Sequence, residues 1–222
     1  MTTSAHLPSK DDERFMSRAL ELAAAQLGAT APNPSVGCVI VKDGRIVGEG
    51  ATGNGGRPHA EELALTAAGD AAKDACAYVT LEPCNARSTG ALSCSQLLTG
   101  AGIARVVIAC EDPHHLAAHG ISRLGAAGVE TLLGVMRAQA EHLNRGFFKL
   151  VATGRPWLAI DADAATYDTE FDLKRDESFE QALERLGRHV TRVFVRAGTP
   201  IAAQLKARGL VDEDRSGSSN GE

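Results

Sequence analysis

Three residues in the first half of the chain have the side chains and the placing that a zinc site requires. His59 stands in the stretch RPHAEELAL, directly after a proline and at the expected start of a helix. Cys84 and Cys94 lie in polar, irregular stretches, each near the expected end of a strand or first turn of a helix. One imidazole and two thiolates leave the fourth position of zinc to water, which is the catalytic arrangement. We therefore expect His59, Cys84 and Cys94 to bind a catalytic Zn²⁺ ion.

Two glutamates beside His59 are candidates for the proton transfer that zinc hydrolysis needs. Zinc lowers the pKa of its bound water to about 7, and a nearby carboxylate can accept the proton and return it to the leaving group. Glu61 and Glu62 are the local candidates. Positions two apart on a regular helix point to nearly opposite sides, which favours Glu62, but this argument weakens in a first turn. The residues alone leave both glutamates open.

A structural zinc site is the alternative for the same residues, with His114 or His115 as a fourth ligand. The other three cysteines, Cys38, Cys76 and Cys110, lie in apolar, strand-like runs, where we expect small buried side chains. An odd number of scattered cysteines does not indicate a disulfide framework. The metal interpretation therefore concerns Cys84 and Cys94 only.

Strands and helices alternate around these residues and predict an α/β sandwich, one sheet with helices on both faces. The Asp43-Gly44 dipeptide between two apolar runs is a strong hairpin signal. In such a sheet, loops beyond the carboxyl ends of the strands converge on one crevice. The expected strands cover residues 36–50 as a hairpin, 76–83, 104–113 and 129–135, and the expected helices begin at residues 12, 59, 94, 121 and 137.

The character of the chain changes after Gly154. A strand-like start gives way to charged, irregular sequence, followed by a helix near residues 179–186, a strand TRVFVRAG and a helix PIAAQLKARGL. The tail DEDRSGSSNGE has the composition of a disordered segment. We expect a disordered start at residues 1–11, the main domain at 12–154, a short α/β appendage at 155–212 and a disordered tail at 213–222.

Composition excludes several classes of protein. The 222-residue chain carries a formal net charge of −5, which argues against a nucleic-acid-binding surface. It contains no apolar run of membrane-spanning length, and its polar first residues lack the apolar segment of a secretory signal. We expect a cytoplasmic protein without membrane or nucleic-acid partners.

The motifs resemble those of a known family. PHAE, then TLEPC and a later cysteine, is similar to the H-x-E…P-C signature of zinc nucleobase deaminases. The long CNARSTGALSC spacing resembles the deaminase domain of the bifunctional riboflavin-biosynthesis deaminase–reductase family, as do APNPSVGCVIVKDGRIVGEG, LLTGAGIARVVIACEDP and LNRGFFKLVATGRPWL. The resemblance covers about residues 13–158. It implies a cytidine-deaminase-like, three-layer α/β/α sandwich with a mixed central sheet.

The resemblance also implies a reaction and its residues. The substrate would be the pyrimidine ribotide 2,5-diamino-6-ribosylamino-4(3H)-pyrimidinone 5′-phosphate, whose 2-amino group is replaced by water with release of ammonia. His59, Cys84 and Cys94 match the zinc ligands, and Glu61, not Glu62, matches the proton shuttle. Two further residues match the substrate pocket: Asn33 in PNPSVG and Asp112 in EDP.

This chain departs from the family pattern in three places. The loop between the cysteines reads NARSTGALS, where Arg87 is the candidate for a basic substrate contact. Thr52 stands where the family often has a histidine, seven residues before the zinc histidine. Arg196-Ala197-Gly198 stands where the reductase often has Glu-Gly-Gly. We therefore expect a shortened reductase-like remnant without NADPH, a separate protein for the reduction, and a homodimer. The alternatives are a deaminase for another base or nucleoside and a non-catalytic zinc-stabilised protein.

Overall fold

The computed structural model describes residues 7–87, 90–115 and 117–217, and its contacts divide the chain into two compact units. The first unit contains Ser35–Leu143 and the residues up to Gln26. The second contains Leu27–Pro34 and the chain from Asn144 onward. The predicted main domain, 12–154, thus has a different boundary in the structure, because the last predicted helix is broken at Asn144 and its second half belongs to the second unit. Of the predicted disordered start, 1–11, residues 1–6 lie outside the described residues, whereas residues 10 and 11 belong to the first helix.

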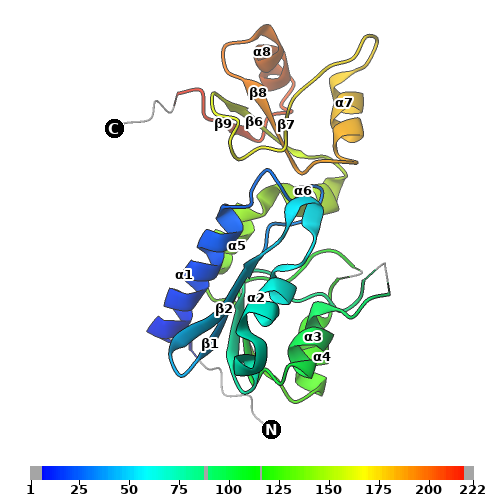
Figure 1. Cartoon of the computed structure of the whole chain (residues 1–222). Helices are drawn as coiled ribbons and strands as arrows, with labels where there is room; N and C mark the ends of the chain where they lie inside the picture. Colours follow the sequence, from blue (N-terminus) through cyan, green and yellow to red (C-terminus); the bar gives the residue numbers. More distant parts are fainter. Residues whose placement is uncertain (1–6, 88–89, 116, 218–222) are drawn as a thin grey trace. The chain divides into compact units, whose positions relative to one another are not determined.

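The first unit is a three-layer sandwich around a mixed five-stranded sheet, as predicted. The strand order is β2-β1-β3-β4-β5, with antiparallel pairing of β1 to β2 and β3, and parallel pairing of β3 to β4 and β4 to β5. Figure 1 shows α1 and α5 on one face of this sheet and α2, α3 and α4 on the other. The elements are α1 (Lys10–Ala24), β1 (Gly37–Lys42), β2 (Arg45–Ala51), α2 (Ala60–Ala68), β3 (Cys76–Val79), α3 (Cys94–Gly100), β4 (Arg105–Ile108), α4 (Gly120–Ala126), β5 (Glu130–Leu133) and α5 (Arg137–Leu143).

Local sequence explains where these elements begin and turn. Helix α1 starts two residues before the predicted position, because Ser9 caps it and the Asp12 carboxylate accepts the Ser9 N–H in return. The predicted Asp43-Gly44 turn joins β1 to β2, with both residues at positive φ. Cys38 and Cys110 are fully buried as expected, whereas Cys76 is only partly buried.

Helix α2 lies unusually close to the sheet, and glycines make this possible. An added Cβ at Gly50 would stand 2.3 Å from Ala60 O, and one at Gly48 would stand 2.2 Å from Ala64 O. The helix contributes small side chains at the same contact, with Ala60 and Ala64 fully buried. The sequence VGEG in β2 therefore determines how near the start of α2 comes to the sheet.

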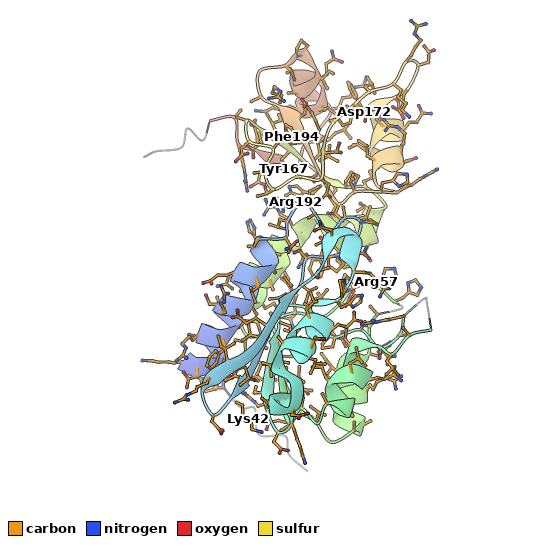
Figure 2. All side chains as sticks on the ribbon, viewed as in Figure 1. Lys42, Arg57, Tyr167, Asp172, Arg192 and Phe194 are labelled. Atoms are coloured by element: carbon orange, nitrogen blue, oxygen red, sulfur yellow. The ribbon has the colours of Figure 1, made fainter. Side chains whose placement is uncertain are left out.

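The second unit has a four-stranded parallel sheet in the order β7-β8-β6-β9. It has an apolar core of its own, and Arg192 lies over the ring of Tyr167, which packs against Phe194 (Figure 2). The tail was predicted to be disordered from residue 213, but Glu213–Asp214 pair with β6. The elements are α6 (Arg145–Thr153), β6 (Trp157–Asp161), β7 (Thr169–Glu170), α7 (Phe179–Leu186), β8 (Arg192–Arg196), α8 (Pro200–Ala207) and β9 (Glu213–Asp214). In the part of the chain that the structure describes, no helix is long and apolar enough to span a bilayer.

Candidate metal centre

His59 is the residue that precedes helix α2, and its backbone is extended there. Its main-chain N–H donates to Glu62 Oε2 at 2.8 Å. The carboxylate three residues later thus supplies an acceptor for an N–H group that has no partner within the helix. This leaves the imidazole free to point away from the helix. Arg57, labelled in Figure 2, belongs to the loop before α2. Its Nη1 lies at 3.3 Å from Nε2 of the His59 ring. The Nδ1 atom therefore faces the other candidate ligands.

The two thiols come from the loop after β3 and from the first residue of α3. Ser93 caps α3, and Gln96 accepts the Ser93 N–H at 2.9 Å in return. The N–H of Cys94 donates to Cys84 Sγ at 3.2 Å. Ser95 donates to the carbonyl of Cys84 from its hydroxyl at 3.0 Å. The start of α3 is thereby attached to the loop that follows β3.

These three side chains converge on one point. His59 Nδ1 lies 3.2 Å from Cys94 Sγ and 3.8 Å from Cys84 Sγ, and all three atoms lie within 4.8 Å of one another. Zn–N and Zn–S bonds in a tetrahedral site place ligand atoms about 3.5–3.8 Å apart. The donor set and its spacing fit zinc. Among the described residues, this group of candidate ligands contains neither His114 nor His115. The rings of these two histidines stack on each other, with their centroids 4.9 Å apart.

Hydrogen bonding favours a thiolate in the cluster. Bonds from Cys94, His59 and Arg87 lower the pKa of the Cys84 thiol, with the bond from the Cys94 side chain the strongest cause. Cys94 has a raised pKa because it donates to Cys84 and is buried. A proton shared between two sulfurs leaves one of them ionised, and a metal ligand must be ionised.

The two glutamates of α2 have different environments. Glu61 is buried, and this burial raises its pKa. It also interacts with the charges of His59 and Cys84 and hydrogen-bonds the Cys94 side chain. Glu62 is partly exposed and is engaged by Arg87 and by the His59 N–H. The carboxyl that faces the three candidate ligands is that of Glu61, although regular helix geometry favoured Glu62.

The four predicted substrate residues lie in different settings. The side chain of Arg87 is buried, with Nη1 at 3.0 Å from Glu62 Oε1 and Nη2 donating to Cys94 Sγ at 3.3 Å. Asp112 follows β4 and is buried, which raises its pKa to about 6. Thr52 is buried, and its Oγ1 accepts the Val36 N–H at 2.9 Å. Asn33 belongs to the second unit, where its N–H donates to Thr30 O at 3.0 Å.

Sequence reasoning missed Glu82, which organises the loop around Asp112. Its two carboxylate oxygens accept the N–H of Asp112 at 3.3 Å and that of Ile121, in the first turn of α4, at 3.0 Å. Its position two residues before Cys84, shortly after the end of β3, is the signal that could have identified it. Arg57 was missed as well, although it stands only two residues before His59.

Comparison with known proteins gives a consistent result. The family model of the cytidine and deoxycytidylate deaminase zinc-binding region matches residues 9–110. The chain is 48% identical to RibD of Escherichia coli over 155 residues, which cover 69% of this chain and 42% of that protein. It is 44% identical to diaminohydroxyphosphoribosylamino-pyrimidine deaminase of Buchnera aphidicola, over 66% of this chain and 99% of that protein.

Solved structures extend the likeness into the second unit. A RibD structure from Acinetobacter baumannii matches with a TM-score of 0.80 and 25% identity, covering 92% of this chain and 85% of that chain. A deaminase/reductase structure from Thermotoga maritima supports the same fold, with a TM-score of 0.81. The chain nevertheless spans less than half the length of RibD from Escherichia coli and Haemophilus influenzae. The match to the zinc-binding region and the 44% identity to the Buchnera deaminase, over 99% of that protein, show that this chain belongs to the riboflavin-biosynthesis deaminase family.

Proposed function

We propose that this chain hydrolyses the 2-amino group of 2,5-diamino-6-ribosylamino-4(3H)-pyrimidinone 5′-phosphate, giving 5-amino-6-(5-phosphoribosylamino)uracil and ammonia. The observation that carries this proposal is the convergence of His59, Cys84 and Cys94 beside the buried carboxyl of Glu61. The Buchnera relative, which this chain covers almost completely, bears the name of this deaminase. In the reaction, the oxygen of water bonds to the ring carbon and the carbon–nitrogen bond breaks.

His59, Cys84 and Cys94 would hold the metal. Bound there, zinc lowers the pKa of water to about 7 and so supplies a nucleophile at neutral pH. Glu61 would accept a proton from the attacking water and then donate a proton to the departing amino nitrogen, which would leave as ammonia. Burial of Glu61 raises its pKa and so makes it a better proton acceptor than an exposed carboxylate.

Four residues are proposed to contact the substrate: Asn33, Thr52, Arg87 and Asp112. Arg87 has a buried Nε–H without a hydrogen-bond partner among the described atoms, which an oxygen of the substrate could accept. Asp112, with a pKa near 6, can offer either a carboxyl O–H or a carboxylate to the pyrimidine. Thr52 would have to exchange its bond with Val36 for a substrate contact, and Thr52→Val tests this through KM.

Ammonia release from the pyrimidine ribotide by the purified, zinc-loaded chain tests the function. Glu61→Gln should lower kcat by orders of magnitude while zinc stays bound, because Gln cannot carry the proton. Glu141→Gln makes the same change on the exposed surface of α5 and should leave kcat as it is. Turnover of cytidine, dCMP or guanine instead would favour a deaminase for another base. Zinc binding without turnover of any of them would favour a non-catalytic zinc protein.

We further propose that residues 155–212 are a reductase-like remnant that does not use NADPH, so that a separate protein performs the reduction. The support is the Arg196-Ala197-Gly198 sequence at the end of β8. Consumption of NADPH by the purified chain, given the deaminated product, would contradict this. We also propose that the chain is a cytoplasmic homodimer; sedimentation velocity measures the dimer, and a monomer at micromolar concentration would exclude it.

A further inference from the structure

An ion pair between the buried guanidinium of Arg87 and the partly exposed carboxylate of Glu62 connects the candidate metal ligands from outside the cluster. Arg87 Nη1 lies 3.0 Å from Glu62 Oε1, and Arg87 Nη2 donates to Cys94 Sγ at 3.3 Å. The other oxygen of Glu62 accepts the main-chain N–H of His59 at 2.8 Å. A continuous series of contacts therefore runs from the main chain of His59, through Glu62 and Arg87, to the sulfur of Cys94.

Burial of the arginine distinguishes this pair from the other described ion pairs of the first unit. The side chain of Arg87 is 4% exposed. A guanidinium removed from water is stable only where acceptors replace the water, and here Glu62 and a sulfur supply them. The Arg18–Glu49 pair is as close, at 2.7 Å, but its arginine is 41% exposed and faces no sulfur. Arg18 is therefore a matched control for Arg87.

An N–H donor affects a thiolate ligand in two ways. It fixes the direction of the sulfur lone pair that remains for the metal, and it withdraws electron density from that sulfur. Two thiolates and the carboxyl of Glu61 also bring several negative groups to one buried point. A positive charge at 3.3 Å from Cys94 Sγ offsets part of their repulsion.

We propose that Glu62 and Arg87 are positioning residues for the zinc site: Glu62 holds Arg87, and Arg87 holds the sulfur of Cys94. This inference rests on the proposed metal site and adds two residues to it. Arg87 contacts Glu62 through Nη1 and the ligand Cys94 through Nη2, which leaves its Nε for the substrate contact proposed above. Glu62, which regular helix geometry favoured for proton transfer, instead supports metal binding by holding Arg87.

Zinc affinity of the full chain, measured by competition with a chromophoric chelator, tests the pair. Arg87→Met should weaken zinc binding about 10- to 100-fold, the usual effect of removing an outer partner of a metal ligand. Arg87→Lys should restore part of the loss, because an ammonium can still donate to the sulfur. Glu62→Gln should weaken binding less, because Gln still accepts the His59 N–H. Arg18→Met should bind zinc like the wild type.

The absorption spectrum with Co²⁺ in place of zinc separates positioning from general loosening. Loss of the N–H donor raises the energy of the sulfur electrons, so the sulfur-to-cobalt charge-transfer band should move to longer wavelength in Arg87→Met. A weaker band at an unchanged wavelength would overturn the proposal, as would unchanged zinc affinity. Cys84→Ala distinguishes failure of this proposal from failure of the proposed metal site. If Cys84→Ala binds zinc as tightly as the wild type, the metal site itself is refuted.

Discussion

Replacement of Gly50 by alanine tests how the sheet positions the metal ligand. The added Cβ would stand 2.3 Å from Ala60 O and 2.7 Å from Ala64 N. Real Cβ atoms stay at least 3.0 Å from such neighbours, so β2 and the start of α2 must separate by about 0.7 Å. Overpacking of this kind costs about 1–3 kcal/mol. We expect the free energy of unfolding of Gly50→Ala to fall by about 2 kcal/mol.

The same shift should reach the metal site, because Ala60 directly follows His59. Metal–ligand bonds tolerate displacements of about 0.2 Å, so a shift of about 0.7 Å at the neighbouring residue should weaken zinc binding at least 10-fold. Gly48→Ala would meet Ala64 O at 2.2 Å, one helical turn further from His59. It should lower stability as much as Gly50→Ala but weaken zinc binding less.

Urea unfolding with zinc in excess measures the stability, and chelator competition measures the zinc affinity. Gly125→Ala is the matched control, because nothing lies within 4 Å of a Cβ at this position in α4. It should leave zinc affinity unchanged and raise stability by up to about 1 kcal/mol. If Gly50→Ala matches Gly125→Ala in both measurements, α2 is not positioned by contact with β2, and the reasoning fails.

Two further predictions concern buried carboxylates. Burial raises the pKa of Asp112 from 3.8 to about 6, so the folded state holds its proton more tightly than the unfolded state and loses stability as pH rises from about 4 to about 6. Asp112→Asn should remove this loss, so that at pH 7 its free energy of unfolding exceeds that of the wild type by up to about 3 kcal/mol. Urea unfolding across pH measures this, and a difference in free energy that does not change with pH would contradict it. Burial alone would raise the pKa of Asp12, but hydrogen bonds from Arg105 and Ser9 lower it to about 2. The Asp12–Arg105 ion pair therefore stabilises the fold above pH 4 and ceases to do so as pH falls through 2. Arg105→Met should cost about 3 kcal/mol at pH 7 and much less near pH 2, and equal losses at both pH values would refute this.

The sequence predicted the elements of the first unit well, for identifiable reasons. Two apolar runs joined by the Asp43-Gly44 turn specify β1 and β2, and capping residues such as Ser93 mark where helices begin. The second unit was predicted less completely. Strands β7 and β9 have two residues each, which is too short for an alternating pattern, and only their pairing with β8 and β6 defines them.

The position of the candidate site was predictable from topology, but its outer contacts were not. A strand end followed by Cys84 and a helix start at Cys94 predict convergence whatever the length of the loop between them. The contact of Arg87 with Glu62 depends instead on the path of an irregular loop, to which no periodic pattern applies. The break between α5 and α6 at Asn144 was missed for a different reason: the apolar pattern continues through it, so the sequence predicts one helix.

The arrangement of the cluster explains why two of its ligands, His59 and Cys94, stand at helix starts and not inside helices. A helix start offers free N–H groups and a partial positive charge, both of which favour a thiolate. Cys94 uses this directly, since its own N–H donates to Cys84 Sγ. His59 stands just outside α2, where the backbone is extended and the imidazole can reach across to α3. A ligand placed one turn later would point along the helix surface toward the sheet, and the negative cluster would lose the N–H groups that compensate its charge.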